Sequence, residues 1–294
     1  MRVCVTGSRG FIGRNLVEQL GPAHELTAVD VAELDLVDEA AVDAFLGRHA
    51  TFDVVIHTAV WGASRNASLD QSLVLRNNLL MYLNLARRAH RFGKLIYFGS
   101  GAQYCNQRAE PLAPESALDA HLPHDDYSLA KYLMAHVTSL REGVYELIPF
   151  AVYGKHEDWM IRFISNACCK ALHDLPITIR QNRRYDYLLA DDLGRIVQWF
   201  MENAPEQRHF NVCTAAPVEL LELARMVREA SGKDIPIEVA QPGLGREYSG
   251  DNSRLLATMG GFDFTPHRQG VEQLYRWYSD NRDRIDPARL HLDG

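Results

Sequence analysis

A glycine-rich turn near the N-terminus limits the possible folds more than any other feature of the chain. Residues 6–13 read TGSRGFIG and join a short apolar run, Arg2–Thr6, to an apolar pattern with helical spacing over Phe11–Leu20. Glycines at such a junction let backbone N–H groups approach a phosphate at the helix N-terminus, because no Cβ stands in the way. This strand–turn–helix context predicts a dinucleotide-binding unit. Its predicted cofactor contacts are Gly7, Arg9, Gly10, Phe11, Ile12 and Gly13.

The end of the next predicted strand bears on which dinucleotide binds. Asp30 directly follows the apolar run Leu26–Val29. A carboxylate there accepts hydrogen bonds from an adenosine ribose 2′-hydroxyl group and repels a 2′-phosphate. Arg9 favours the opposite choice, because a guanidinium binds phosphate oxygens well. We therefore expect NAD as the cofactor and keep NADP as the second choice. The alternative is a structural glycine turn followed by a surface aspartate.

Strand-like and helix-like stretches alternate along the first half of the chain. The predicted strands are Arg2–Thr6, Leu26–Val29, Val54–His57, Leu95–Phe98 and Tyr145–Phe150. The predicted helices are Phe11–Leu20, Asp38–Leu46, Ser68–His90 and Asp126–Leu140. Strands separated by helices indicate parallel pairing with right-handed crossovers. The predicted fold class is therefore α/β, with a doubly wound parallel sheet of the Rossmann type.

The pattern changes after Gly154, where the predicted strands become shorter. They are Ile177–Ile179, Tyr187–Leu189 and Phe210–Val212, and the predicted helices between and after them are Asp192–Met201, Pro217–Ala230 and Val271–Asn281. We expect a dinucleotide-binding Rossmann domain over residues 1–154 that carries the catalytic site. Residues 155–294 are expected to form mainly a smaller α/β substrate-binding lobe, with returns to the first domain. Tyr104–Asp125 lacks periodicity and is predicted to be a long loop, a class of segment that is often functional.

Composition excludes several other classes of protein. The formal net charge of −7 argues against nucleic-acid binding, which depends on a basic surface. No apolar run approaches the roughly 18 residues of a membrane span, and the N-terminus leads directly into the first predicted strand. The five cysteines form no CxxC motif, and we expect neither a metal site nor a disulfide framework. A cytoplasmic protein that contacts neither nucleic acid nor membrane is expected.

A serine, a tyrosine and a lysine carry the predicted chemistry. Ser100 follows the predicted strand Leu95–Phe98, while Tyr127 and Lys131 lie one helical turn apart. An ammonium and a positive nicotinamide nearby lower the pKa of a phenol from its ordinary value of about 10, so we expect a lowered pKa for Tyr127. The phenol then exchanges a proton with a sugar hydroxyl while hydride moves at the same carbon. The alternative is an incidental Tyr/Lys pair on a solvated helix face.

Together these features resemble the extended short-chain dehydrogenase/reductase family, which includes the epimerases, dehydratases and reductases of nucleotide sugars. The resemblance extends over nearly the whole chain. Further matching segments are His57-Thr58-Ala59, Val152-Tyr153-Gly154, the stretch YDYLLADD at 185–192, and Arg246 followed by Asp251-Asn252-Ser253-Arg254. The resemblance implies that Ser100, Tyr127 and Lys131 are the catalytic residues.

The same resemblance implies further ligand contacts. Tyr127 and Lys131 would also hold the dinucleotide, together with Leu36, Ala59 and Val152. The implied substrate residues are Asn78, Arg184 and Arg246. The implied partner is a nucleotide-sugar substrate. In the family two long helices, here Ser68–His90 and Asp126–Leu140, commonly form a dimer interface, which implies a homodimer.

Departures from the family pattern narrow the expected reaction. Dehydratases of the family carry an acidic pair after the catalytic residue, whereas Gly101 and Ala102 follow Ser100 here, so dehydration is not expected. We expect an NAD(P)-dependent enzyme that transfers hydride at a ring carbon, expected to be C4, of a nucleotide-activated sugar. It would act as a 4-ketoreductase or as a 4-epimerase. The alternative is a non-catalytic member of the same fold that senses a cofactor or serves as a scaffold.

Overall fold

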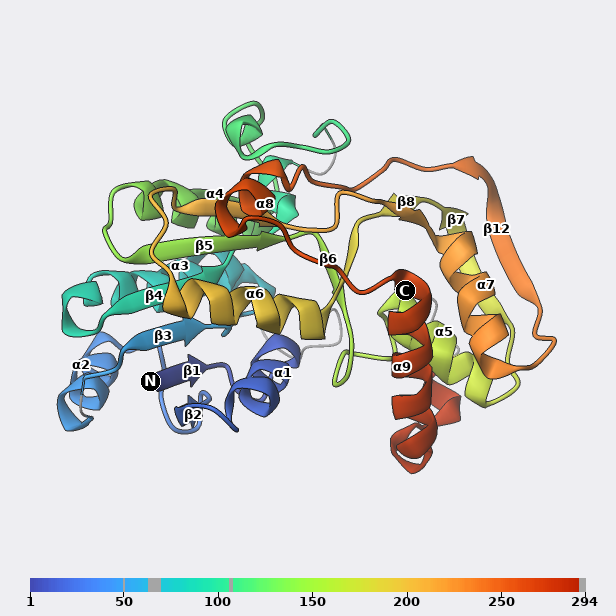
Figure 1. Cartoon of the computed structure of the whole chain (residues 1–294), viewed down its shortest axis with the longest axis horizontal. Coiled ribbons are helices and arrows are strands. Elements are labelled where there is room, and N and C mark those ends of the chain that lie inside the picture. The colour runs from blue at the N-terminus through green and yellow to red at the C-terminus, as the bar shows by residue number, and fades with distance from the viewer. Residues whose placement is uncertain (50, 63–69, 106–107, 291–294) are drawn as a thin grey trace.

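A six-stranded parallel sheet forms the centre of the larger part of the molecule (Figure 1). The computed structural model describes residues 1–49, 51–62, 70–105 and 108–290. The sheet consists of β1 (Arg2–Thr6), β2 (Glu25–Val29), β3 (Val54–His57), β4 (Lys94–Phe98), β5 (Val144–Pro149) and β10 (His209–Val212). The strand order is β10-β5-β4-β3-β1-β2, and every pair is parallel. The order reverses between β1 and β3, which is where ligands bind in sheets of this kind.

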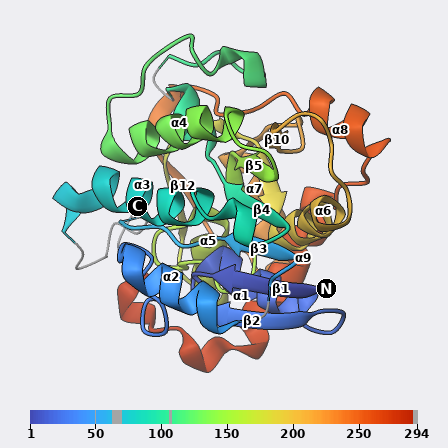
Figure 2. The same cartoon turned by 90° about the vertical axis from the view of Figure 1, so that its left-hand side faces the viewer.

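Helices cover both faces of the sheet because its strands are apolar on both sides. They are α1 (Phe11–Leu20), α2 (Glu39–Arg48), α3 (Val74–Ala86), α4 (Asp126–Ser139) and α6 (Ala190–Glu202). Val3 and Val5 of β1 pack on one face against α1 and α6, while Cys4 packs on the other against α2 and α3. Figure 2 shows α2, α3 and α4 on one side of the strands and α6 on the other. The prediction of a doubly wound α/β fold is confirmed.

A second hydrophobic core lies in the smaller lobe, on the right of Figure 1. Its main elements are α5 (Phe163–Leu172), β7 (Ile177–Asn182), α7 (Leu220–Ser231), β12 (Ile237–Leu244) and α9 (His267–Asp280). Shorter elements are β6 (Ala151–Tyr153), β8 (Arg184–Tyr185), β9 (Tyr187–Leu189) and β11 (Val218–Glu219). The helix α8 (Ser253–Met259) instead packs against β10 of the large sheet. The three helices pack on one another, and β7 pairs with β12 in parallel. The boundary at residue 154 stays a prediction, because β10 returns from beyond it to the large sheet.

Several predicted bounds differ from those observed. The helix predicted over Ser68–His90 is shorter, because Asp70 caps a separate 3₁₀ turn at Gln71–Leu73 and the helix ends at Ala86; Ser68 lies outside the described residues. The helix predicted from Pro217 begins at Leu220, because Val218 and Glu219 pair with β8. The strand β12 and the helix α8 were not predicted. The long loop 104–125 is largely irregular where it is described, with short 3₁₀ turns at Gly101–Tyr104 and Glu115–Ala117.

Candidate active site

The glycine turn forms a tight cradle between β1 and α1. Gly7 has a φ of +67°, and a Cβ on it would lie 2.6 Å from the backbone of Ala59. A Cβ on Gly13 would lie 2.2 Å from the carbonyl oxygen of Gly7. Gly10 precedes α1 and provides no side chain to cap it, so the first N–H groups of the helix are free to receive a phosphate. The cradle therefore fits the pyrophosphate of a dinucleotide, while Phe11 and Ile12 are half-buried in the first turn of α1.

Two carboxylates and one guanidinium meet at the end of β2. The Asp30 carboxylate accepts hydrogen bonds from the backbone N–H groups of Arg9 at 3.0 Å and Val31 at 2.8 Å. The Arg9 guanidinium forms an ion pair with Glu33, whose other carboxylate oxygen accepts from the Asp30 N–H at 3.0 Å. The charge of Arg9 is thus matched by Glu33. This leaves Asp30 as a second negative group where an adenosine ribose would lie.

The other predicted cofactor residues are placed differently from one another. Ala59 lies against Gly7, and Val152 is half-buried in β6. Leu36 is only 4% exposed and packs in the core between the sheet and α2. Its carbonyl accepts a hydrogen bond from Asn84 at 2.9 Å. The side chain of Leu36 therefore belongs to the core rather than to an open surface.

Ser100 is held in a short turn immediately after β4. Its hydroxyl accepts a hydrogen bond from the Ala102 N–H at 3.2 Å, and its own N–H donates to the Gln103 side chain at 3.2 Å. These two bonds form a capping box at the start of the 3₁₀ turn. The turn packs against α4, which carries Tyr127 and Lys131. The three predicted catalytic residues are therefore brought to one end of β4.

Tyr127 lies in the first turn of α4, in contact with Ser100. Burial raises the pKa of its phenol, and a hydrogen-bonding contact with Ser100 and the charge of Arg162 oppose that rise. The predicted lowering also depends on a bound, positively charged nicotinamide, and it stays a prediction. The Lys131 ammonium is 5.8 Å from the centre of the phenol ring, and it donates to the carbonyl of Phe98 at 2.6 Å instead.

Lys131 is a buried cation with few neighbours that favour its charge. It is 6% exposed, and burial lowers its pKa to about 8, while the charge of Glu146 opposes that decrease. His57 is also influenced by Lys131. Burial and the charge of Lys131 lower the pKa of the His57 imidazole to about 3. His57 is therefore neutral near pH 7, with its Nδ1 bonded to the Thr6 hydroxyl at 2.9 Å.

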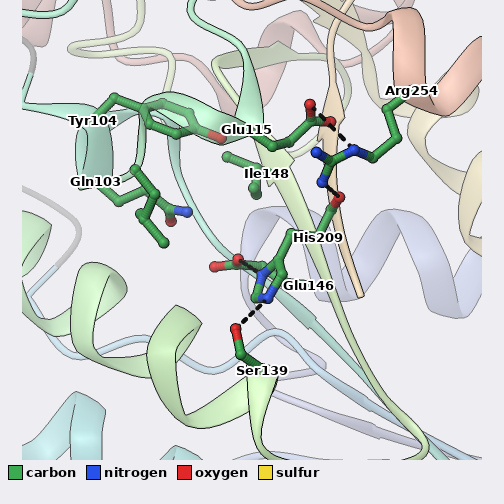
Figure 3. A pocket seen from close by; sticks show the side chains of 9 residues that line it. Gln103, Tyr104, Glu115, Ser139, Glu146, Ile148, His209 and Arg254 are labelled. Atoms are coloured by element: carbon green, nitrogen blue, oxygen red, sulfur yellow. Dashed lines mark hydrogen bonds and ion pairs between the residues drawn. The ribbon is translucent and has the colours of Figure 1, made fainter. Parts of the chain in front are cut away.

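A small pocket on β5 surrounds the carboxylate that faces Lys131 (Figure 3). Glu146 is 0% exposed, and its Oε2 lies 2.7 Å from Nδ1 of His209. The other ring nitrogen of His209 contacts the Ser139 hydroxyl at 2.9 Å. Across the pocket, Glu115 pairs with Arg254 at 3.6 Å. No sequence motif marked Glu146, because it lies within an otherwise apolar strand.

The predicted substrate residues are not all available to a substrate. Asn78 is 2% exposed, and its amide group exchanges hydrogen bonds with the backbone of Trp61 at 3.0 Å. It holds a neighbouring segment, and we do not retain it as a substrate residue. Arg184 is exposed and pairs with Glu219 at 3.2 Å. Arg246 is exposed and donates to the carbonyl of Ala109, in the long loop, at 2.7 Å.

Two residues near Tyr127 were missed by sequence reasoning. Arg162 directly precedes α5 in the smaller lobe, and its positive charge acts to lower the pKa of Tyr127. Tyr248 lies between Arg246 and Asp251, inside a segment that the family pattern marks at both ends. A Cβ on Gly101, the residue after Ser100, would lie 2.7 Å from its phenol oxygen. Only tertiary structure brings either residue to α4.

The described part of the chain offers little support for other kinds of site. Within it, no helix is long and apolar enough to cross a membrane. No cluster of three or more His, Cys, Asp or Glu side chains suited to a metal ion occurs among the described residues.

Comparison with known proteins identifies the family of the chain. The model of the NAD dependent epimerase/dehydratase family matches residues 3–213. GDP-L-fucose synthase of Sinorhizobium fredii is 24% identical, covering 95% of this chain and 96% of its own length. A GDP-mannoheptose C4 reductase from Campylobacter jejuni, solved with NADP bound, has a TM-score of 0.79 and 21% identity over 95% of this chain and 98% of its own. A UDP-glucose 4-epimerase from Thermotoga maritima, solved with UDP-glucose, has a TM-score of 0.81 and 20% identity over 96% of this chain and 100% of its own.

The family match begins in β1 and ends just after β10, so it spans the glycine cradle, the Ser100 turn and the helix with Tyr127 and Lys131. It covers well over half of the chain, and the chain therefore belongs to the NAD-dependent epimerase/dehydratase family.

Proposed function

We propose that this protein is an NAD(P)-dependent 4-ketoreductase of nucleotide-activated sugars. The observation that carries the proposal is the convergence of Ser100, Tyr127 and Lys131 at the end of β4, with Gly101 and Ala102 in place of an additional acid. The name of the Campylobacter jejuni reductase states reduction at C4, and the Sinorhizobium fredii relative is named for a GDP-linked sugar. A GDP-linked 4-keto-sugar is therefore the substrate that we expect first.

The proposed mechanism assigns one task to each side chain. A nicotinamide dinucleotide, held by the glycine cradle, supplies the hydride when bound. Tyr127 donates its proton to the oxygen at C4 as the general acid. Ser100 donates a hydrogen bond to the same oxygen. Lys131 holds the nicotinamide ribose and keeps a positive charge near the phenol.

The substrate diphosphate is proposed to bind to arginines. Arg246 and Arg184 are exposed, and a guanidinium presents paired N–H donors to phosphate oxygens. Arg162 is added to this set because it lies near Tyr127. Homodimer formation through α3 and α4 and a cytoplasmic location stay predictions.

A 4-epimerase is the second candidate, and the surroundings of Asp30 favour it. Asp30 and Glu33 together disfavour a 2′-phosphate, so the cofactor would be NAD. An epimerase must first oxidise its substrate, for which the phenol has to accept a proton. Gly101 and Ala102 add no further acid or base beside Ser100, and we therefore place reduction first. A cofactor-sensing member without turnover is the third outcome.

The proposal is tested by incubating the purified protein with a GDP-linked 4-keto-6-deoxyhexose and either reduced dinucleotide. Nicotinamide absorbance is expected to fall as the sugar gains one hydride and one proton, observed by mass spectrometry. Interconversion of 4-epimers without net oxidation of the cofactor would identify an epimerase. Nucleotide-hexoses that still carry their 4- and 6-hydroxyl groups are expected to give no 4-keto-6-deoxy product, because the site lacks the additional acid. Formation of that product would contradict the proposed reaction.

We propose that the protein prefers NAD(H) over NADP(H), and that Glu33 contributes by pairing with Arg9. Glu33→Gln is expected to improve NADP(H) affinity by about tenfold, because it frees the guanidinium and removes one repelling charge. NAD(H) affinity should change little. Calorimetric titration with both dinucleotides measures the effect. Glu25→Gln, at the exposed start of β2, is the matched control. NADP(H) binding at least tenfold tighter than NAD(H) in the unmodified protein would overturn the preference.

A further inference from the structure

A buried carboxylate lies beneath the end of β4. A Cβ on Gly99 would lie only 2.4 Å from Oε1 of Glu146, so the carboxylate lies directly against the backbone at that residue. Gly99 follows Phe98, whose carbonyl accepts a hydrogen bond from the Lys131 ammonium at 2.6 Å. The carboxylate and the ammonium therefore lie against two consecutive residues of the chain.

The geometry of β5 and α4 directs both groups into the same layer of the molecule. Val144 of β5 packs in one hydrophobic cluster with Met134 of α4. Alternate residues of a strand share a face, so Glu146 lies on the face that Val144 turns toward α4. Residues three apart on a helix also share a face, which places Lys131 beside Met134. The two charged groups are thus enclosed between α4 and the sheet, where Glu146 is 0% and Lys131 is 6% exposed.

His209 holds the other oxygen of the Glu146 carboxylate (Figure 3). Oε2 lies 2.7 Å from Nδ1 of His209, and Nε2 of His209 lies 2.9 Å from the hydroxyl of Ser139, at the end of α4. An ionised carboxylate only accepts, so Nδ1 carries the proton between the two groups. Across the pocket, Glu115 and Arg254 pair with each other. Oε1 of Glu146 has no hydrogen-bond partner among the described residues, and it is left to offset a nearby positive charge.

The other titratable groups around this pair are uncharged near pH 7. The ring of Tyr127 is centred 5.8 Å from the Lys131 ammonium, and His57 is neutral because burial lowers its pKa. Burial also raises the pKa of the buried phenols around Glu146, which are Tyr82, Tyr97 and Tyr104. A buried cation without an opposite charge tends to lose its proton. The negative charge of Glu146 opposes the decrease that burial causes in the pKa of Lys131.

We propose that Glu146 is a positioning residue for Lys131: its buried carboxylate keeps the Lys131 side chain protonated and anchored on the carbonyl of Phe98. Lys131 then presents its full positive charge to the nicotinamide ribose and to the Tyr127 phenol, the two tasks proposed for it. Because the effect is electrostatic, it should follow the charge at position 146 and not the volume of the side chain.

The kinetic test rests on the proposed function. Above the pKa of Lys131, each decrease of 1 in that pKa lowers the protonated fraction about tenfold. Glu146→Gln is therefore expected to lower kcat about tenfold at pH 9 and much less at pH 6. Glu142→Gln, which removes an exposed carboxylate shortly before β5, is the matched control and should follow the parent at both pH values. A decrease by the same factor at both pH values would indicate a structural role and contradict the proposal.

A titration that needs no turnover separates this inference from the proposed function. The protein is labelled with ¹³C at lysine Cε, its five lysines are followed by NMR against pH, and Lys131→Arg assigns one signal. Glu146→Gln keeps an acceptor for His209 but removes the charge, and it is expected to lower the pKa of Lys131 by about 1. Glu142→Gln should leave that pKa unchanged. An unchanged pKa in Glu146→Gln, or an equal decrease in both variants, overturns the inference even if reductase activity is found.

A stability cycle applies if Glu146→Gln is too unstable for these measurements. Glu146→Gln is made in the parent and in a Lys131→Met background, and unfolding by denaturant is compared at pH 7. The substitution should destabilise the parent more than it destabilises Lys131→Met, because that variant has no buried ammonium to offset. Equal losses of stability in the two backgrounds, or a double variant that folds no better than Glu146→Gln alone, would overturn the proposal.

Discussion

Tyr127→Phe is expected to lower the rate of keto-sugar reduction by about 10²- to 10⁴-fold, the usual contribution of general acid–base catalysis. The substitution removes one oxygen and leaves the ring to pack in the first turn of α4. Folding, dinucleotide affinity and the KM for the sugar should therefore change little. Steady-state kinetics combined with calorimetric titration of the dinucleotide measure both effects. Nearly full turnover in the variant would show that Tyr127 is a remnant of the fold in a protein that works in another way.

The pH dependence of the same variant tests the direction of proton transfer. Reduction requires the protonated phenol, so the rate should fall as the pH rises through the pKa of Tyr127. Because burial raises that pKa in the protein, the decrease should lie in the alkaline range during reduction, and it should be absent from Tyr127→Phe. A decrease of the parent rate near neutral pH would instead agree with the lowered pKa predicted from sequence.

Lys131→Met is expected to lower the turnover rate more than Tyr127→Phe does, because it removes both a contact to the nicotinamide ribose and the positive charge near the phenol. Although Lys131→Met lowers activity, it should increase the stability of the folded protein. Burial lowers the pKa of Lys131 to about 8, whereas an unfolded lysine titrates near 10.4, and this difference costs the folded protein about 3 kcal/mol at pH 7. The variant loses the hydrogen bond to Phe98, which offsets about 1–3 kcal/mol of the gain.

The change with pH in the stability difference between the parent and Lys131→Met is the sharper measurement. Between the folded and the unfolded pKa of Lys131, the unfolded chain binds more protons, so the unfolding free energy of the parent rises with pH. The stability of the parent relative to Lys131→Met should therefore increase from about pH 8 to about pH 10. Denaturant unfolding at several pH values measures the difference. A difference that is constant with pH would show that Lys131 is not a strained buried cation.

Local sequence was sufficient to predict the parts of the site that depend on local geometry. The contact of Gly13 with the Gly7 carbonyl inside the glycine turn is such a part, whereas Ala59, which lies against Gly7, comes from the end of β3. The Tyr127–Lys131 spacing on one helix is another. Asn78 shows the limit of this reasoning, since its position matched a pattern but its amide is used by the Trp61 backbone.

The remaining parts could not be predicted because they depend on contacts between distant segments. Tyr248 and Arg162 reach Tyr127 from the smaller lobe, and Glu146 faces Lys131 from an apolar strand. The burial that raises the pKa of Tyr127 in the protein was not predicted for the same reason, because the depth of burial follows from the whole fold. The strand β12 was missed because Pro242 and Gly243, which are typical of turns, lie within it.

The position of β10 determines how the chain can reach this fold during synthesis. The outer edge of β5 gains its partner only when residues 209–212 pair with it, after α5, β7 and α6 have been made. A nascent chain that ends at residue 154 would expose an unpaired strand edge, which invites aggregation. The smaller lobe is thus built from segments on both sides of β10, with α5 and β7 before it and α7, β12 and α9 after it. The two halves should therefore unfold as one cooperative unit rather than as separable modules.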